Sequence, residues 1–87
     1  METKITRQSR AGSLESNDLV VMIEPDNGLN IEIKSVVDDL FHDQIEASVK
    51  KYLNELGVKD ARVLIEDRGA LDFTIKARIE TAVRRAR

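Results

Sequence analysis

The spacing of apolar residues changes along this chain, and the change constrains the fold more than any other feature. Over residues 29–35 apolar and polar side chains alternate, which is typical of a strand with one wet face. Over residues 37–56 apolar side chains recur at nearly helical spacing, which predicts an amphipathic helix. Residues 19–24 and 61–66 predict two more strands, and residues 71–83 predict a second helix.

The predicted order of elements is strand, strand, helix, strand, helix, which favours an α+β fold. The simplest packing is a two-layer sandwich, in which a three-stranded sheet carries both helices on one face. The strand over residues 19–24 is apolar on both faces, so we expect it in the centre of the sheet. The strand over residues 61–66 then lies beside it, reached through a right-handed crossover. Val20, Met22 and Leu64 remain on the back face, to be covered by the N-terminal residues or by another subunit.

Short local signals predict how these elements are joined. Pro25 and Gly28 belong to a turn in which proline fixes φ and glycine accepts positive φ, so we expect a hairpin between the first two strands. Ser35 is a candidate N-cap for the first helix, with Asp38 as its capping-box partner. Gly57 suits the position that ends this helix.

The length of 87 residues indicates one domain. Residues 1–18 show neither helical nor strand periodicity, so we expect a flexible leader. A single α/β domain follows over residues 19–87. One tyrosine and two phenylalanines are the only aromatic residues, so the core must be built from valine, isoleucine and leucine.

Composition argues against several classes of protein. The longest apolar run, Leu19 to Ile23, is too short to span a bilayer, and the first residues lack the apolar region of a signal peptide. Cysteine is absent, which excludes disulfides and fits a reducing compartment, so we expect a cytoplasmic protein. Arg84, Arg85 and Arg87 suit the end of a helix dipole better than a nucleic-acid surface, because no stacking aromatics accompany them.

No group of residues predicts a catalytic site. His42 is the only histidine, and with Asp38, Asp39 and Asp43 it forms a candidate metal site. The helical periodicity turns Phe41 inward, however, which leaves these polar residues as a solvated helix start. The sequence also lacks the nucleophile elbow of serine hydrolases and a glycine-rich phosphate loop.

Asp67 and Asp72, on either side of Gly69, form a candidate carboxylate pair. A turn and a helix start explain these two aspartates more simply. Enzymatic activity in this chain alone is therefore not expected, and residue chemistry by itself indicates only a small α/β interaction module.

Three blocks of sequence, in order and at matching spacing, resemble one known family. They are Ala11-Gly12-Ser13-Leu14-Glu15-Ser16-Asn17-Asp18-Leu19, Phe41-His42-Asp43-Gln44-Ile45, and Ile65-Glu66-Asp67-Arg68-Gly69-Ala70-Leu71-Asp72 followed by Ala77-Arg78. The chain resembles the acyl carrier protein of citrate lyase, also called its gamma chain, over nearly its whole length from Ala11 onward. It departs from the family pattern at His42, where glycine is frequent, and at Phe73, where cysteine is frequent.

The resemblance implies a covalent cofactor on Ser16. In the family, 2'-(5''-phosphoribosyl)-3'-dephospho-coenzyme A is attached to the corresponding serine through a phosphodiester, so the chain would be a phosphoprotein. An exposed site on flexible backbone, which Gly12 and its small polar neighbours provide, would let a transferase reach this hydroxyl. Ser13 and Ser9 are rival hydroxyls that chemistry alone does not exclude, and only the register of the motif selects Ser16.

The resemblance also implies a role and a set of partners. The cofactor thiol would hold acetyl and then citryl thioesters during cleavage of citrate to acetate and oxaloacetate. The implied partners are an alpha chain that transfers the acyl group, a beta chain that cleaves it, a holo-carrier synthase transferase and a citrate lyase ligase. Nucleic acid and membrane are not expected as partners. Two alternatives remain open: an acyl carrier of malonate decarboxylase, and an adaptor subunit without any modification.

Overall fold

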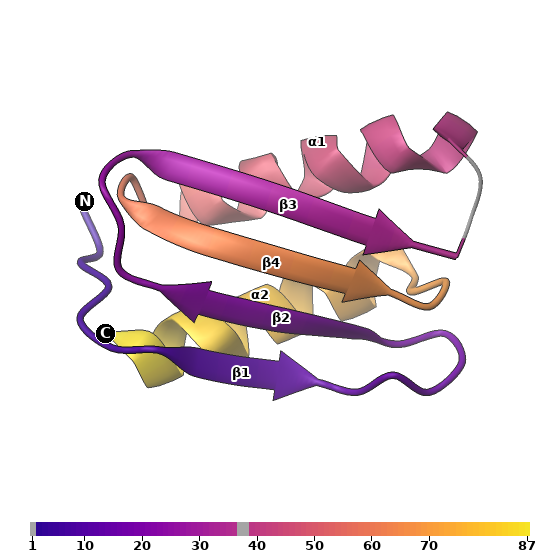
Figure 1. Ribbon diagram of the computed structural model, residues 1–87, viewed down its shortest axis with the longest axis horizontal. Helices are drawn as coiled ribbons and strands as arrows, with labels where there is room; N and C mark the ends of the chain where they lie inside the picture. The colour runs from indigo at the N-terminus through magenta and orange to yellow at the C-terminus, as the bar shows by residue number, and fades with distance from the viewer. Residues whose placement is uncertain (1, 37–38) are drawn as a thin grey trace.

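The computed structural model describes residues 2–36 and 39–87, with the backbone alone for residues 39 and 40. Four strands and two helices follow one another along the described chain (Figure 1). They are β1 (Ser9–Gly12), β2 (Leu19–Glu24), β3 (Leu29–Ser35), α1 (Asp39–Glu55), β4 (Ala61–Asp67) and α2 (Asp72–Ala86). None of the described helices has the length and apolar character needed to cross a membrane.

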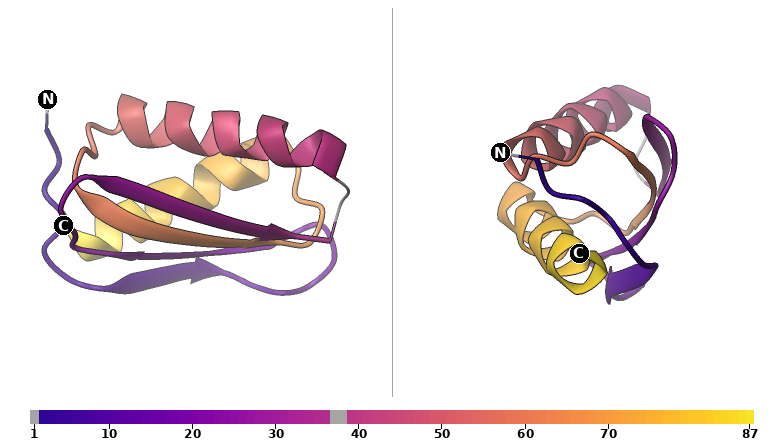
Figure 2. Two further views of the ribbon diagram at one scale, coloured as in Figure 1. Left: turned by 45° about the horizontal axis from the view of Figure 1, so that its top comes forward. Right: turned by 90° about the vertical axis from the view of Figure 1, so that its left-hand side faces the viewer.

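The strands form one sheet in the order β1-β2-β4-β3. Strand β4 runs parallel to β3 and antiparallel to β2, and β2 runs antiparallel to β1. Both helices lie on the same face of the sheet, as Figure 2 shows. The predicted α+β class and the two-layer arrangement are therefore confirmed, as are the central place of β2 and its contact with β4.

The predicted count of three strands is wrong, because the N-terminal segment supplies a fourth. Strand β1 pairs with β2 along one edge of the sheet, and its Ala11 is buried, as is Ile5 before it. The backbone N–H groups of Thr3 and Thr6 donate to Gly57 and Ala86, both at 2.8 Å. Backbone hydrogen bonds attach this strand to the sheet. Because its four residues include only one buried apolar side chain, the sequence shows no detectable strand period there. The flexibility expected of the leader stays a prediction.

The predicted hairpin between the first two strands is also wrong, because β4 lies between β2 and β3. The Gly28 N–H instead donates to the Asp60 carboxylate at 2.8 Å, and the Gly28 carbonyl accepts from Ala61 at 2.9 Å. Val63 and Ile65 of β4 are fully buried, so this strand occupies the interior of the sheet and displaces β3 to the edge. The crossover therefore joins β3 to β4 through α1, and not β2 to β4.

The core lies between the sheet and the helices and consists almost entirely of aliphatic side chains. Each fully buried residue of this kind stabilises the fold by about 1.5–3 kcal/mol. Phe41 was expected to face inward and is 46% exposed instead, while Val37, expected on the same face, lies outside the described residues. The largest fully buried apolar side chains are Leu19, Val21, Ile23, Val49, Leu53, Val63, Ile65 and Ile79.

The back face of the sheet differs in part from expectation. Met22 and Leu64 are half-buried and line a hollow on this face, as expected for side chains that neither α1 nor α2 covers. Val20, expected to share that open face, is buried. The prediction therefore holds for the middle of the face and is wrong at Val20, the residue that pairs with Gly12 near the end of the sheet.

One of the two predicted ends of α1 can be compared with the structure. Gly57 has a φ of 76°, its N–H donates to Asn54, and the next N–H, of Val58, donates to Leu53. This is the Schellman arrangement that favours glycine, and it confirms the predicted helix end. At the other end, Ser35 is the last residue of β3 and Asp38 lies outside the described residues, so the capping box stays a prediction.

The strand register brings several connections to one end of the molecule. Leu19 at the start of β2 and Ser35 at the end of β3 both pair with Asp67 at the end of β4. The β1–β2 loop and the starts of α1 and α2 therefore share this end, on the right of Figure 1.

Candidate functional site

Ser16 lies in the loop of residues 13–18 that joins β1 to β2, and its side chain is exposed. The two rival hydroxyls are both engaged in hydrogen bonds. The Ser13 hydroxyl donates to the Asp18 carboxylate at 2.7 Å, and the Ser9 hydroxyl donates to the Ala82 carbonyl at 2.5 Å. Within the described part of the chain, the Ser16 hydroxyl has no such partner. The structure therefore distinguishes three serines that sequence chemistry left equivalent.

The loop begins at a glycine that the fold requires. Gly12 has a φ of 97°, and a Cβ atom added there would lie 1.8 Å from the Leu19 carbonyl oxygen. The Ser13 N–H donates to that same carbonyl at 3.2 Å and closes the base of the loop. The flexibility that Gly12 was expected to provide stays a prediction, and in the structure Gly12 permits close contact between the two strands.

A turn places Ser16 at the tip of the loop. The Asp18 N–H donates to the Glu15 carbonyl at 3.2 Å, so Ser16 and Asn17 are the two central residues of a β-turn. Asn17 has a φ of 64°, a left-handed conformation that asparagine adopts more easily than most residues. Its N–H donates to the Arg68 carbonyl at 2.8 Å, and the Arg68 N–H donates to the Asp18 carbonyl at 2.9 Å. The turn is thus attached to the connection between β4 and α2.

Asp18 and Arg78 form an ion pair that ties the loop to α2. The Arg78 Nε and Nη2 groups donate to the two carboxylate oxygens of Asp18, at 2.9 and 3.0 Å. The hydrogen bonds from Arg78 hold the pKa of Asp18 at about 2, with further help from the Ser13 hydroxyl and the Leu19 N–H. The same pair raises the pKa of Arg78.

Sequence reasoning missed the role of this ion pair. The two residues are 60 positions apart, and no periodicity connects them. The one available signal was that both belong to the blocks that carry the family resemblance, Asp18 in the first block and Arg78 in the last.

The two aspartates considered as a carboxylate pair have separate structural roles. Asp67 is buried and accepts hydrogen bonds from the N–H groups of Gly69 and Ala70, at 3.0 and 2.9 Å, and from the Ser35 hydroxyl. It therefore holds the turn before α2. Asp72 lies in the first turn of α2 and accepts from two hydroxyl groups of α1.

The two hydroxyls on Asp72 belong to Ser48, at 2.8 Å, and Tyr52. The hydrogen bond from Tyr52 lowers the pKa of Asp72 and, with burial adding to it, raises the pKa of the Tyr52 phenol to about 12. Asp72 thus joins the two helices near the end that carries Ser16.

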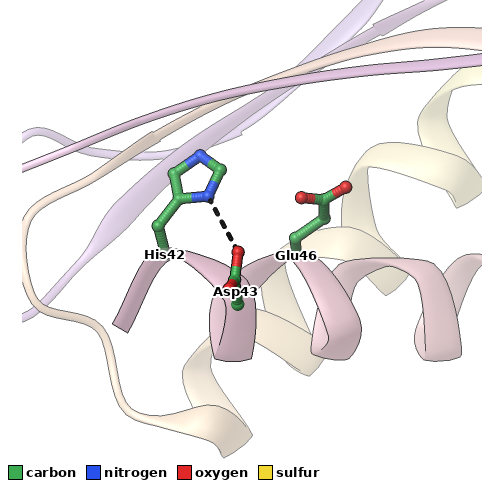
Figure 3. Close-up of side chains that lie close together, drawn as sticks. All are labelled: His42, Asp43 and Glu46. Carbon is green, nitrogen blue, oxygen red and sulfur yellow. Dashed lines mark ion pairs between the residues drawn. The ribbon is translucent and has the colours of Figure 1, made fainter. Parts of the chain in front are cut away.

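The candidate metal residues form a surface cluster on α1 (Figure 3). The possible ligand atoms of His42, Asp43 and Glu46 all lie within 4.8 Å of one another. Asp43 is almost fully exposed and contacts His42 at 3.8 Å, and Glu46 already pairs with Lys50 at 3.0 Å. No side chain is described for Asp39, and Asp38 lies outside the described residues. The cluster is explained by surface ion pairs, and we assign it no ligand.

The candidate site consists of one serine hydroxyl at the tip of a loop that hydrogen bonds and an ion pair attach to the rest of the domain. The family model "ACP: Malonate decarboxylase delta subunit (MdcD)" matches residues 6–86.

Curated relatives cover most of the chain. The chain is 49% identical over 83 residues to a citrate lyase acyl carrier protein of Treponema denticola, covering 95% of each chain. It is 48% identical over 83 residues to a citrate lyase acyl carrier protein of Haemophilus influenzae, covering 95% of this chain and 87% of the relative. The chain therefore belongs to the citrate lyase acyl carrier protein family, and it is a non-catalytic carrier subunit.

The fold also matches a solved structure. A chain in the crystal structure of a Pseudomonas malonate decarboxylase hetero-tetramer in complex with malonate superposes with a TM-score of 0.83. The match covers 99% of this chain and 91% of that chain, at 19% sequence identity. At this level of identity the likeness shows a shared fold.

Proposed function

We propose that this chain is the acyl carrier of a citrate lyase and that Ser16 carries 2'-(5''-phosphoribosyl)-3'-dephospho-coenzyme A through a phosphodiester. The observation that carries the assignment to Ser16 is its exposed hydroxyl at the tip of a turn, without a partner in the described chain. Ser9 and Ser13 would each have to break a hydrogen bond to react.

The residues present fit a large, charged group of this kind. Attachment needs a primary hydroxyl that a transferase can enclose, and solvent around it for the attached group. In the attachment step, the donor would be an activated form of the group with a phosphoric anhydride bond. The Ser16 oxygen would form its bond to phosphorus as that anhydride bond breaks, and the departing phosphate chain would take the electron pair. The hydroxyl proton passes to a base of the transferase, since Ser16 has no base as a hydrogen-bond partner in the described chain.

When attached, the group supplies a terminal thiol that holds acyl groups as thioesters. The contribution of the chain is to tether this group and to fix the position of its base. A tethered group reaches successive active sites at an effective concentration on the order of millimolar, without dissociating. The Asp18–Arg78 pair and the backbone bonds to Arg68 hold the attachment point in place relative to the domain.

The partners follow from this role. We propose an alpha chain and a beta chain of citrate lyase as the enzymes that the tethered group visits, and a holo-carrier synthase transferase and a citrate lyase ligase as the enzymes that prepare it. An acyl carrier of malonate decarboxylase is the second candidate. The shared fold and the description of the matching family model favour it.

Mass spectrometry tests the attachment site directly. The protein is produced together with the holo-carrier synthase transferase, and its intact mass is compared with the mass of the bare chain. We expect an added mass that peptide mapping places on Ser16, complete loss of this addition in Ser16→Ala, and retention in the matched control Ser13→Ala. An added group on a peptide that contains Ser13 but not Ser16 would disprove the assignment.

Reconstitution separates the candidate functions. Added to citrate lyase alpha and beta chains, the modified protein should support cleavage of citrate, and Ser16→Ala should not. Activity only with the malonate decarboxylase subunits would favour the second candidate. Full citrate cleavage with Ser16→Ala would instead identify an adaptor that needs no modification.

A further inference from the structure

Large apolar side chains are exposed in an uneven way on this molecule. Among the residues whose side chains the structure describes, six such residues are exposed, and five of them surround the end that carries Ser16. Phe73 is 70% exposed and Val36 is 65% exposed, so neither contributes to the core. The five, which we call the apolar rim, are Leu14, Val36, Phe41, Leu71 and Phe73.

The strand register explains why the apolar rim lies at one end. Leu14 belongs to the loop of Ser16, and Val36 directly follows β3. Leu71 is the N-cap residue of α2, Phe73 belongs to its first turn, and Phe41 belongs to the first turn of α1. All five positions therefore lie near the end of the sheet at which β3 and β4 end and β2 begins (Figure 1).

The apolar rim has no evident role in folding. Single exposed apolar residues are ordinary on protein surfaces, but a group of five at one end is typical of an interaction site. The sixth exposed residue, Leu29, begins β3 at the opposite end of the sheet, and it has no such neighbours in this set.

Carboxylates accompany the apolar rim. Glu15 follows Leu14, and Asp72 lies between Leu71 and Phe73. Two arginines contact the loop, Arg68 through its backbone and Arg78 through its guanidinium group, and their side chains are paired with Glu66 and Asp18. The exposed Glu15 therefore places a negative charge in the loop of Ser16, beside the apolar rim. Such a surface complements a partner whose contact surface is apolar with basic groups at its margin.

We propose that the apolar rim is the docking surface for the transferase that modifies Ser16. This inference rests on the proposed attachment at Ser16. A serine side chain is short, so its hydroxyl enters an active site only if the surface around it touches the enzyme. Later partners meet a long tethered group and can act from further away. The transferase is therefore the partner for which contact with the apolar rim is required.

Kinetics of modification test the docking surface. The variants are Leu71→Gln and Phe73→Gln, with Leu29→Gln as the matched control at the opposite end. Both rim residues are exposed, and glutamine adds no charge, so folding should be unchanged. For each rim variant we expect the KM of the transferase for the carrier to rise by roughly 10-fold or more, with little change in kcat, because docking is lost while the chemistry is kept. The control should keep the wild-type KM.

A charge variant tests the acidic margin separately. In dilute buffer, the KM of the transferase should be higher for Glu15→Lys than for the wild-type carrier. This difference should shrink at high salt as the charges are screened. A difference in KM that stays the same at high salt would contradict the basic margin assigned to the transferase. Circular dichroism melting of each variant checks that the domain remains folded.

The outcomes separate the docking surface from the attachment site. If wild-type protein gains no mass on Ser16, the proposed function fails. If wild-type protein is modified and the rim variants are modified with unchanged KM, the docking surface alone is disproved. If the rim variants are modified normally but lose only citrate cleavage with the alpha and beta chains, the apolar rim belongs to those chains and the transferase is the wrong occupant.

Discussion

Two loops at opposite ends of β2 each contain an aspartate held by an arginine, but they are restrained to different degrees. In the loop of residues 13–18, Asp18 receives two N–H groups of Arg78 at 2.9 and 3.0 Å, and only 13% of its side chain is exposed. In the connection over residues 25–28, Asp26 receives one N–H group of Arg62 at 3.3 Å, and 28% of its side chain is exposed.

The two arginines also differ in the part of the fold to which they attach the loop. Arg62 belongs to a strand of the same sheet, whereas Arg78 comes from a helix and joins the loop to the second layer. Backbone hydrogen bonds to Arg68 fix the same loop to a further segment. The loop with the candidate attachment site is therefore restrained on both sides of Ser16, while the Ser16 hydroxyl at its tip stays exposed.

The largest expected effect concerns the glycines of the two loops. Gly12→Ala should destabilise the domain by roughly 3 kcal/mol or more, because the added Cβ would collide with the Leu19 carbonyl at a positive φ. Gly28→Ala places its Cβ in open space and should cost about 1 kcal/mol from its φ of 72° alone. Denaturant unfolding measures both. Equal losses would show that the two loops are held alike.

A smaller effect is expected from the two arginines. Arg78→Gln should lower the free energy of unfolding by about 1–3 kcal/mol, because Asp18 loses two charge-assisted hydrogen bonds. Arg62→Gln, the matched control, should change it little, because exposed ion pairs contribute little to stability. The comparison between the loops breaks if Arg62→Gln proves as destabilising as Arg78→Gln.

A third effect is a pH dependence of the restrained loop. The unfolded chain binds a proton at Asp18 with an ordinary pKa of about 3.9, while the folded protein holds this pKa at about 2. The stabilisation from the ionised carboxylate is therefore complete above pH ~4 and is lost as pH falls toward ~2. In Arg78→Gln the pKa of Asp18 should return toward its usual range, which removes part of this dependence.

Carboxyl NMR titration of Asp18 in both proteins measures the effect. An Asp18 pKa near 2 that persists in Arg78→Gln would show that the Ser13 hydroxyl and the Leu19 N–H, and not the guanidinium, dominate the shift.

Local sequence patterns were enough to predict most elements, and the register of a motif selects Ser16 as the attachment residue, which stays a prediction. Residues 19–24, 29–35 and 61–66 each lie in a strand, and Gly57 ends the first helix as predicted. These features depend on side chains a few positions apart. Ser16 could be selected because its motif is continuous in sequence, although the residues alone did not separate it from Ser9 and Ser13.

The sequence by itself determined the α+β class, the aliphatic core and the acyl carrier family. Only the tertiary structure decided that β4 inserts between β2 and β3, that β1 joins the edge, and that Arg78 reaches Asp18. The physical reason is the range of the interactions. Periodicity and turn chemistry depend on residues that are near neighbours in the sequence. Strand order and ion pairing depend instead on which segments bury their surfaces together. A contact between residues 60 positions apart produces no periodic pattern in the sequence.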